Sequence, residues 1–333
     1  MEMEEMEVHN AVPEFSDPLN GWLLPRYPLA VRDALSPRGQ LISANSTGVE
    51  LRFVTPGRQF RVTLANPGER MEVTVRKGSF WKEKLHLEAG ATRGFIVEEP
   101  GGFGTVEKSA LASGQWDAAV WRLQFDGPSP VLLDLDPMGE AIRPPRGAEK
   151  PARRWLAYGS SITNADLQGY VFIAAQDLRV DVLNKGLSGS CHIEPEAADW
   201  LASLDFDFAT LELGINMRGQ FEPPEFEKRV RYLYKVLRER HPKTPLVLIT
   251  HFLNRDHHVA GELSKVARHQ LAYDTILLDL HAGADDPNLH LVEGTEILDD
   301  FSLLTADFIH PTHEGHARMG RNLANQLREL LGI

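Results

Sequence analysis

The sequence contains a single cysteine, Cys191, among 333 residues. An intrachain disulfide is therefore impossible, which excludes the small secreted domains that depend on disulfides for stability. A zinc site built from several cysteines is excluded for the same reason. The sequence also lacks any apolar run of the roughly 20 residues that a transmembrane helix requires.

Basic residues are outnumbered: 35 Lys and Arg stand against 47 Asp and Glu, which gives a formal net charge of −12. Nucleic acids and anionic membranes are bound through basic surfaces, so neither is expected as a partner. The N-terminal stretch MEMEEMEVHNAV is acidic and is followed by no apolar region of the kind found in secretory signals, which favours a cytoplasmic location. The composition leaves the oligomeric state open, with a homo-oligomer as one option. The length predicts two domains.

The first half of the chain, residues 21–145, shows a hydrophobic period of two. In GVELRFVT, Val49, Leu51 and Phe53 fall on one face and charged residues fall on the other. Further alternating segments are FRVTL, MEVTV and WRLQF, separated by turns rich in glycine and proline. Short alternating strands at this spacing predict an all-β sandwich, and no strongly helical stretch is evident. Residues 1–20 are expected to form an N-terminal tail.

The second half, residues 146–333, follows a linker near residues 137–152 that is rich in proline, glycine and charge. Apolar runs here alternate with stretches of helical periodicity. The runs predicted as strands are RWLAYG, VDVLNKG, DFATLELG, PLVLIT and TILLDLH. Such alternation predicts an α/β domain with a parallel sheet and helices on both faces. In these sheets ligands bind beyond the carboxyl ends of the strands, so the residues there are the first candidates for chemistry.

Small and reactive residues occupy those positions. The candidates are Ser160 and Ser161 after the first run, Gly189 and Cys191 after the second, Asn216 after the third, His251 after the fourth, and Asp307 and His310 in a late loop. A serine hydroxyl becomes a good nucleophile only when a base removes its proton, and histidine has a pKa suited to that task. A carboxylate on the other ring nitrogen fixes the tautomer. The sequence therefore predicts nucleophilic catalysis.

Four of these segments resemble, in order and spacing, the four sequence blocks of the SGNH, or GDSL-like, hydrolases. The blocks are YGSSIT with Ser161, LSGS with Gly189, GIN with Asn216, and DFIHP with Asp307 and His310. The resemblance covers about residues 153–333. It implies a flavodoxin-like, five-stranded α/β sheet. It also implies a catalytic triad of Ser161, Asp307 and His310, an oxyanion hole of Ser161, Gly189 and Asn216, and no cofactor or metal.

The arrangement of a β-sandwich ahead of such a domain also resembles family-two carbohydrate esterases and certain GDSL-like acyltransferases. That resemblance implies a jelly-roll-like sandwich and short acyl groups, with acetyl as the expectation. Two positions depart from the family pattern. Ser160 stands where an aspartate usually precedes the nucleophile, and Met217 stands where an aspartate often follows the asparagine. Neither position supplies a member of the triad.

Each candidate also has a purely structural interpretation. The two serines could cap a helix, and Gly189 and Asn216 could be turn residues. Asp307 and His310 could cap a last helix that begins near Thr312 or His313.

Three other residues near the strand ends are possible pocket residues: Ser160, His251 and Cys191. A buried cysteine, however, is usually a small core residue. A metal site among His257, His258, His313 and His316 is not predicted, because no carboxylate or cysteine framework accompanies them. Trp81, Trp116 and Trp121 are assigned to core packing in preference to a sugar-stacking platform.

The leading hypothesis is a serine esterase acting on short-chain, expected acetyl, esters of a small molecule or a carbohydrate through an acyl-enzyme on Ser161. The first alternative is an acyltransferase that uses the same triad with an alcohol acceptor. The second alternative is a glycan-binding protein with an inert hydrolase-like domain.

Overall fold

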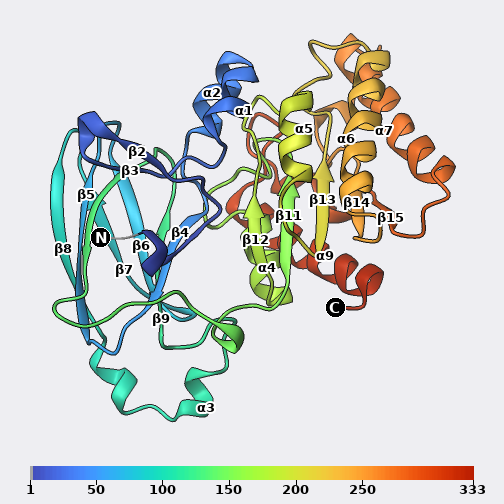
Figure 1. The fold of residues 1–333 in the computed structure, drawn as a ribbon. Coiled ribbons are helices and arrows are strands. Elements are labelled where there is room, and N and C mark those ends of the chain that lie inside the picture. Colours follow the sequence, from blue (N-terminus) through green and yellow to red (C-terminus); the bar gives the residue numbers. More distant parts are fainter. Residues whose placement is uncertain (1–2) are drawn as a thin grey trace. The chain divides into compact units, whose positions relative to one another are not determined.

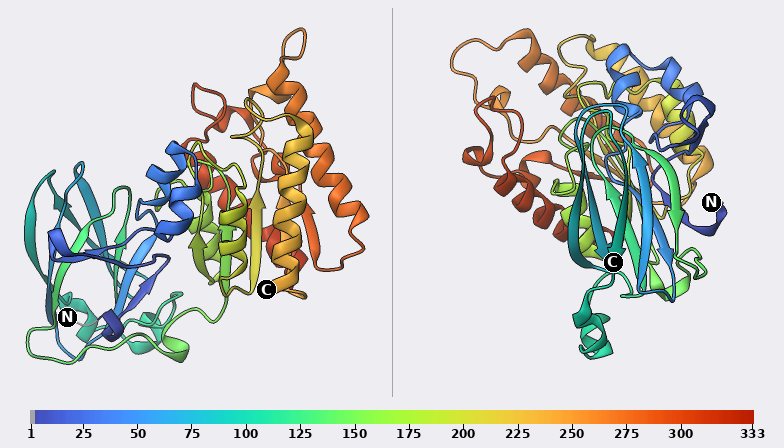
Figure 2. Two further views of the ribbon diagram at one scale, coloured as in Figure 1. Left: turned by 45° about the horizontal axis from the view of Figure 1, so that its top comes forward. Right: turned by 90° about the vertical axis from the view of Figure 1, so that its left-hand side faces the viewer.

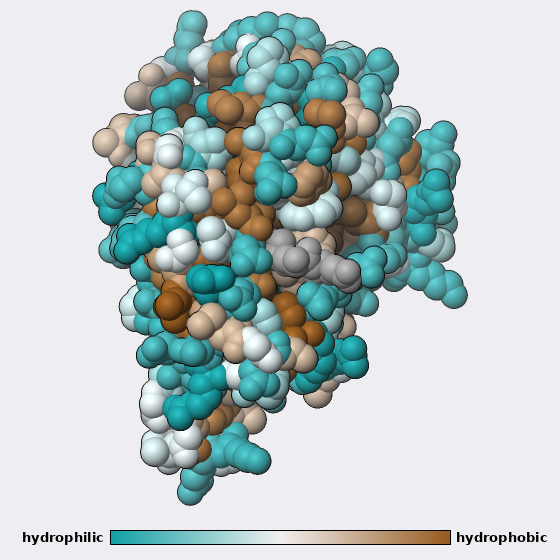
Figure 3. Space-filling view, turned by 60° about the vertical axis from the view of Figure 1, so that its left-hand side comes forward, coloured by the Kyte–Doolittle hydropathy of each residue, from teal (hydrophilic) through white to brown (hydrophobic). Residues whose placement is uncertain are grey.

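The computed structural model describes residues 3–333, which divide into two compact units. The first contains the described part of Met1–Pro28 together with Ser43–Ala152, and the second contains Leu29–Ile42 and Arg153–Ile333. Within residues 3–333, no helix combines the length and the apolar character needed to cross a bilayer. On the face drawn in Figure 3, hydrophilic residues are spread between apolar ones, as is usual for protein surfaces.

The first unit consists of two antiparallel five-stranded sheets (Figure 1). One sheet has the order β1 (Glu7–His9), β4 (Val49–Val54), β9 (Val120–Phe125), β6 (Met71–Lys77) and β7 (Phe80–Leu87). The other has the order β2 (Glu14–Ser16), β3 (Gly21–Leu23), β10 (Val131–Asp136), β5 (Gln59–Ala65) and β8 (Thr92–Glu98). Both sheets contribute side chains to one apolar cluster. The predicted β-sandwich is therefore confirmed.

The alternating pattern of β4 explains how the sandwich forms its core. Val49, Leu51 and Phe53 are all fully buried, and the ring of Phe53 packs edge-on against Phe60 of β5 at 4.9 Å between centroids. Alternate residues of a strand share a face, so one face of β4 is apolar throughout. Each such side chain contributes about 1.5–3 kcal/mol through burial.

The opposite face of β4 and β9 is charged but also buried. Glu50 accepts hydrogen bonds from Arg52 Nε at 2.7 Å, Arg122 Nε at 2.8 Å and Gln124 Nε2 at 2.6 Å. Both guanidinium groups lie over the ring of Trp116, at 4.3 and 4.4 Å from its centroid. Burial alone would raise the pKa of Glu50, but the two arginines hold it well below its usual range. Pairing of this kind is what makes a buried charge tolerable.

The N-terminal region differs from the sequence-based expectation in two ways. Residues 1–20 were expected to be a tail, but they include β1 and β2, whose three residues each are too few to show an alternating pattern. Helices were not expected before residue 137, but α1 (Leu29–Ala34), α2 (Pro37–Ser43) and α3 (Lys108–Leu111) are present. These helices span at most two turns, so their periodicity does not stand out from the sequence.

The second unit contains a parallel sheet with the strand order β12, β11, β13, β14, β15. Its strands are β11 (Arg154–Tyr158), β12 (Asp181–Asn184), β13 (Phe208–Glu212), β14 (Leu246–Ile249) and β15 (Leu289–Val292). Its main helices are α4 (Tyr170–Leu178), α5 (Pro195–Ala202), α6 (Pro223–Arg240), α7 (Lys265–Gly283), α8 (Gly294–Ile297) and α9 (His313–Leu331). Helices α4 and α9 pack on one face of the sheet, and α5, α6 and α7 cover the other (Figure 2). This is the predicted flavodoxin-like α/β fold.

The position of the fifth strand was predicted incorrectly. The apolar run TILLDLH lies inside α7, and the fifth strand is β15, with the short sequence LHLV. Tyr273, Leu277 and Leu280 of α7 are buried at spacings of four and three residues, which is a helical period. A dense apolar run shows no clear period of its own, so helix and strand are difficult to distinguish there.

Candidate active site

The segment after β11 forms a tight turn around Ser161. The backbone N–H of Ser160 donates a 2.6 Å hydrogen bond to Glu212 Oε2, and the Ser160 hydroxyl accepts one from the N–H of Ile162 at 3.2 Å. Ser160 is fully buried, whereas Ser161 is half-buried. The turn therefore fixes the backbone of Ser160 and leaves the hydroxyl of Ser161 accessible.

Glycine is required at the start of this turn. A Cβ atom on Gly159 would lie 2.5 Å from Glu212 Oε2, so any side chain would displace the buried carboxyl group. Glu212, the last residue of β13, also accepts a 3.1 Å hydrogen bond from Thr163 Oγ1. Burial raises the pKa of Glu212, and the hydrogen bonds from Ser160 and Thr163 oppose that shift. The carboxyl group thus links the ends of β11 and β13.

Ser161, His310 and Asp307 form a continuous hydrogen-bonded chain. Ser161 Oγ lies 2.8 Å from His310 Nε2, and His310 Nδ1 lies 2.6 Å from Asp307 Oδ2. The other carboxylate oxygen of Asp307 accepts the backbone N–H groups of Ile309 at 2.8 Å and His310 at 2.9 Å. Burial raises the pKa of Asp307, but these hydrogen bonds, above all that from the His310 ring, bring it well below its usual value. Asp307 is therefore an anion that accepts from the imidazole.

A strained backbone position brings Asp307 and His310 together. Phe308 has φ of +58°, in the left-handed region that costs a bulky residue about 1–3 kcal/mol. The bend is held by the N–H of Arg255, which donates to the Phe308 carbonyl at 2.9 Å, and by the N–H of Phe308, which donates to Thr305 O at 2.9 Å. Helix α9 begins at His313, and the N-cap is Thr312, whose hydroxyl accepts from the N–H of Gly315. Asp307 and His310 are therefore not the cap of this helix.

Three N–H donors lie in the loops that carry the candidate oxyanion-hole residues. Asn216 Oδ1 accepts the backbone N–H of Cys191 at 3.1 Å, which joins the Asn216 turn to the loop containing Gly189. Gly189 is exposed and has φ of +70°. Within residues 3–333, the backbone N–H groups of Ser161 and Gly189 and the side-chain amide of Asn216 donate to no protein acceptor. These donors are therefore free to bind a ligand oxygen.

The three possible pocket residues, Ser160, His251 and Cys191, are all buried, with at most 3% exposure. His251 follows β14, and its Nδ1 lies 2.7 Å from Asp274 Oδ1. Burial raises the pKa of the Cys191 thiol well above its usual value, which makes it a poor nucleophile. The role of these three side chains as pocket residues stays a prediction.

The other histidines and tryptophans singled out from the sequence lie in several different environments. His257 Nδ1 accepts the N–H of Asn254 at 3.2 Å, and His316 Nδ1 accepts that of Tyr170 at 3.3 Å. Neither they nor His258 and His313 belong to a group of three metal-ligating side chains within the part of the chain that the structure describes. Trp116 and Trp121 are buried, in agreement with core packing, whereas Trp81 is 60% exposed.

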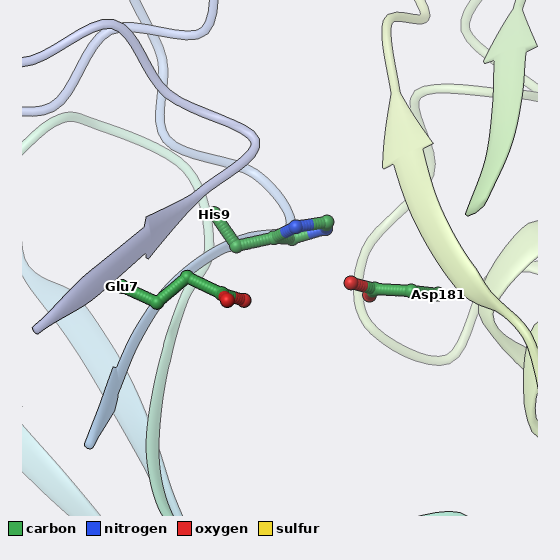
Figure 4. Close-up of side chains that lie close together, drawn as sticks. All are labelled: Glu7, His9 and Asp181. Atoms are coloured by element: carbon green, nitrogen blue, oxygen red, sulfur yellow. The ribbon is translucent and has the colours of Figure 1, made fainter. Parts of the chain in front are cut away.

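Glu7 and His9 are a further pair of ionisable residues, and they project from the same side of β1 (Figure 4). Arg52 Nη1 donates to Glu7 Oε1 at 2.9 Å, and Lys150 also forms an ion pair with this carboxylate. Burial raises the pKa of Glu7, but the two cations bring it below its usual value. Because it pairs with these two cations, Glu7 is an ion-pairing residue of the first unit. Asp181, also drawn in Figure 4, is the first residue of β12 in the second unit.

Sequence reasoning missed two residues near the site, Glu212 and Arg38. Glu212 had a usable signal, because a carboxyl group within a strand whose neighbours are apolar requires a buried hydrogen-bonding role. Arg38 lies on α2 and donates from Nε to Ser188 O at 3.3 Å. No local feature of the sequence links residue 38 to residue 188.

Comparison with solved structures shows similarity along nearly the whole chain. A salicylyl-acyltransferase from a tetracycline biosynthetic pathway is 18% identical, with a TM-score of 0.78 over 98% of this chain and 95% of that one. A family-two carbohydrate esterase from Clostridium thermocellum, in complex with cellohexaose, is 15% identical, with a TM-score of 0.63 over 98% and 99%. An acetyl xylan esterase from the rumen bacterium Butyrivibrio proteoclasticus is 12% identical, with a TM-score of 0.59 over 100% and 96%. At these identities the likeness establishes the fold.

Comparison with sequences identifies the family. No curated protein gives a significant match to the chain. The model of the GDSL-like Lipase/Acylhydrolase family matches residues 152–328, more than half of the sequence and nearly all of the α/β unit. The chain therefore belongs to the GDSL-like lipase/acylhydrolase family, and it is an enzyme of the esterase/acylhydrolase class.

Proposed function

We propose that the protein is a serine esterase that hydrolyses short-chain esters, with acetyl as the preferred acyl group, on a small molecule or a carbohydrate. The observation that carries this proposal is the chain of two hydrogen bonds, 2.8 and 2.6 Å long, that joins Ser161 through His310 to Asp307. This order of hydroxyl, imidazole and carboxylate suits removal of a proton from the serine as it attacks.

In the first half of the reaction, Ser161 Oγ bonds to the ester carbonyl carbon and its proton moves to His310 Nε2. The carbonyl oxygen becomes an oxyanion, which the free N–H donors of Ser161, Gly189 and Asn216 stabilise. Collapse breaks the bond to the alcohol oxygen, and His310 returns the proton to the departing alcohol. Asp307 remains ionised throughout and holds Nδ1–H toward itself.

In the second half, His310 removes a proton from water as the water attacks the acyl-enzyme. The oxyanion forms again against the same donors, and collapse releases the carboxylic acid and restores the Ser161 hydroxyl. The short length of the acyl group is inferred from the architectural likeness to an acetyl xylan esterase.

Hydrolysis of a series of 4-nitrophenyl esters, from acetate to octanoate, tests the proposal. We expect the highest kcat/KM for the shortest esters and a loss of at least about 10⁴-fold in Ser161→Ala. Labelling with a fluorophosphonate and mass mapping should place the adduct on Ser161. A Ser161→Ala variant with the wild-type rate would exclude the mechanism. Absence of both turnover and labelling would favour the alternative of a glycan-binding protein.

Acyl transfer to an alcohol is the second candidate, and it is favoured by the likeness to the salicylyl-acyltransferase, with a TM-score of 0.78. The same acyl-enzyme would form, and an alcohol would replace water in the second half. Adding alcohols during hydrolysis separates the two cases. An acyltransferase yields mainly the new ester at millimolar alcohol, whereas an esterase continues to yield mainly the free acid.

A further inference from the structure

The segment Leu29–Ile42 interrupts the first unit in the sequence but belongs to the second unit in the structure. Val31 of α1 and Leu35, which lies between the two short helices, are both buried, and α1 packs against α5. Burial raises the pKa of the Glu194 carboxyl group, just before α5, and the backbone N–H of Ser36 opposes that shift. These contacts fix the position of α2 relative to the loop that follows β12.

Arg38 of α2 lies directly against the loop that carries Gly189. Its Nε donates to the carbonyl oxygen of Ser188 at 3.3 Å. A Cβ atom on Gly189 would lie 3.7 Å from Arg38 Nε and 3.9 Å from Arg38 Cγ. The arginine side chain therefore passes beside the α-carbon of the residue whose N–H is one of the three free donors of the candidate site.

The charge of Arg38 is not neutralised by the protein. The side chain is exposed, and within residues 3–333 it forms no ion pair and donates only to Ser188. Arg231, another exposed arginine of this unit, is by contrast paired with Glu227 at 2.8 Å. The chain carries a net charge of −12, so carboxylates are abundant, yet no carboxylate among the described residues pairs with Arg38.

The two terminal nitrogens of the guanidinium group, Nη1 and Nη2, remain available as parallel donors. This planar pair matches the two oxygens of a carboxylate and binds it in a bidentate manner. We propose that Arg38 is a specificity-determining residue, which binds a carboxylate group of the ester substrate a few bonds away from the carbonyl that Ser161 attacks. This inference rests on the proposed esterase function and narrows its substrates to esters that carry an acid group.

Two pairs of substrates test the inference and show which side of the ester carries the acid. On the acyl side, mono-4-nitrophenyl succinate is compared with 4-nitrophenyl pentanoate. On the alcohol side, 3-acetoxybenzoate is compared with its neutral methyl ester. We expect the acidic member of one pair to have the higher kcat/KM in the wild type. In Arg38→Gln that preference should fall about ten- to hundredfold, as for loss of a charge-assisted hydrogen-bonded pair.

Two further variants sharpen the assignment. Arg38→Lys keeps the charge without the bidentate geometry, so it should keep part of the preference. Arg231→Gln removes an exposed, paired arginine on α6 and should leave the preference unchanged. The inference is overturned if the wild type hydrolyses neutral esters but shows no higher kcat/KM for the acidic member of either pair. It is also overturned if Arg38→Gln keeps the full preference for the acidic substrate. In both cases the proposed esterase function stands. If no ester is hydrolysed, the proposed function itself fails.

Discussion

The Oε2 atom of Glu212 accepts a 2.6 Å hydrogen bond from the backbone N–H of Ser160, the residue before the candidate nucleophile. Glu212 is 3% exposed, so this hydrogen bond is shielded from bulk water. The bond ties the backbone of the turn after β11 to the end of β13. Glu212 is thus a positioning residue, because it acts on Ser161 through the backbone of Ser160.

Replacing Glu212 by alanine should reduce both stability and turnover. The N–H of Ser160 would be buried without a partner, which costs about 1–3 kcal/mol of unfolding free energy. A looser turn should lower kcat about 10- to 100-fold, since small displacements of a catalytic group are costly. Glu212→Gln retains a carbonyl acceptor and should recover most of the turnover. Urea unfolding and ester hydrolysis measure the two effects, with the exposed Glu196→Ala on α5 as the control. Equal kcat in the alanine and glutamine variants would argue against the positioning role.

Asp307→Asn tests the role of the carboxylate that faces His310 Nδ1. An amide can present its N–H₂ to this nitrogen and favour the wrong tautomer, in which Nε2 carries the proton and cannot accept the one from Ser161. We expect kcat to fall about 10³- to 10⁴-fold, with a smaller change in KM. Asp300→Asn alters another exposed aspartate, which caps the short helix Phe301–Leu303, and should leave kcat near the wild-type value. A loss below tenfold in Asp307→Asn would mean that the carboxylate does not orient the imidazole.

The sequence was sufficient to point to the segments of the candidate site, because a parallel sheet gathers the residues that follow its strands at one edge. Ser161 and His310 were identified in this way, and the structure places their side chains within hydrogen-bonding distance. The fifth strand was misplaced, since a dense apolar run fits both a helix and a strand. Arg38 could not be found, because the path of the chain from the first unit to the second and back is a tertiary feature that residues 29–42 do not signal locally.

Asn216→Asp separates the two roles of the Asn216 side chain. Its Oδ1 accepts the N–H of Cys191 at 3.1 Å, and aspartate retains this acceptor. Aspartate lacks the N–H₂ donor and adds a negative charge beside the developing oxyanion. We expect kcat to fall about 10²- to 10³-fold or more, with little change in thermal stability. In Asn216→Ala the bond to Cys191 is lost as well, so the melting temperature should fall too. Retention of full kcat in the aspartate variant would remove Asn216 from the oxyanion hole.

His316 on α9 should make stability depend on pH in the mildly acidic range. Its Nδ1 accepts the N–H of Tyr170, and burial lowers its pKa from 6.5 to about 4. The unfolded chain therefore binds a proton at this imidazole at a higher pH than the folded chain does. As the pH falls from about 6.5 to about 4, the free energy of unfolding decreases; above this window the imidazole is neutral in both states, and it contributes nothing to the slope.

The shift corresponds to a loss of about 2–3 kcal/mol across that window. His316→Asn places an uncharged acceptor on the same helix position, so the variant should lose less stability than the wild type between pH 7 and pH 4. Urea unfolding at pH 4, 5, 6 and 7 gives the free energy of unfolding of both proteins. Subtracting one pH profile from the other cancels the contributions of the titratable groups that the two proteins share. His313→Asn replaces an exposed histidine one turn earlier on α9 and serves as the control. If the wild type and His316→Asn show parallel pH profiles, the imidazole at position 316 is not held neutral by the fold.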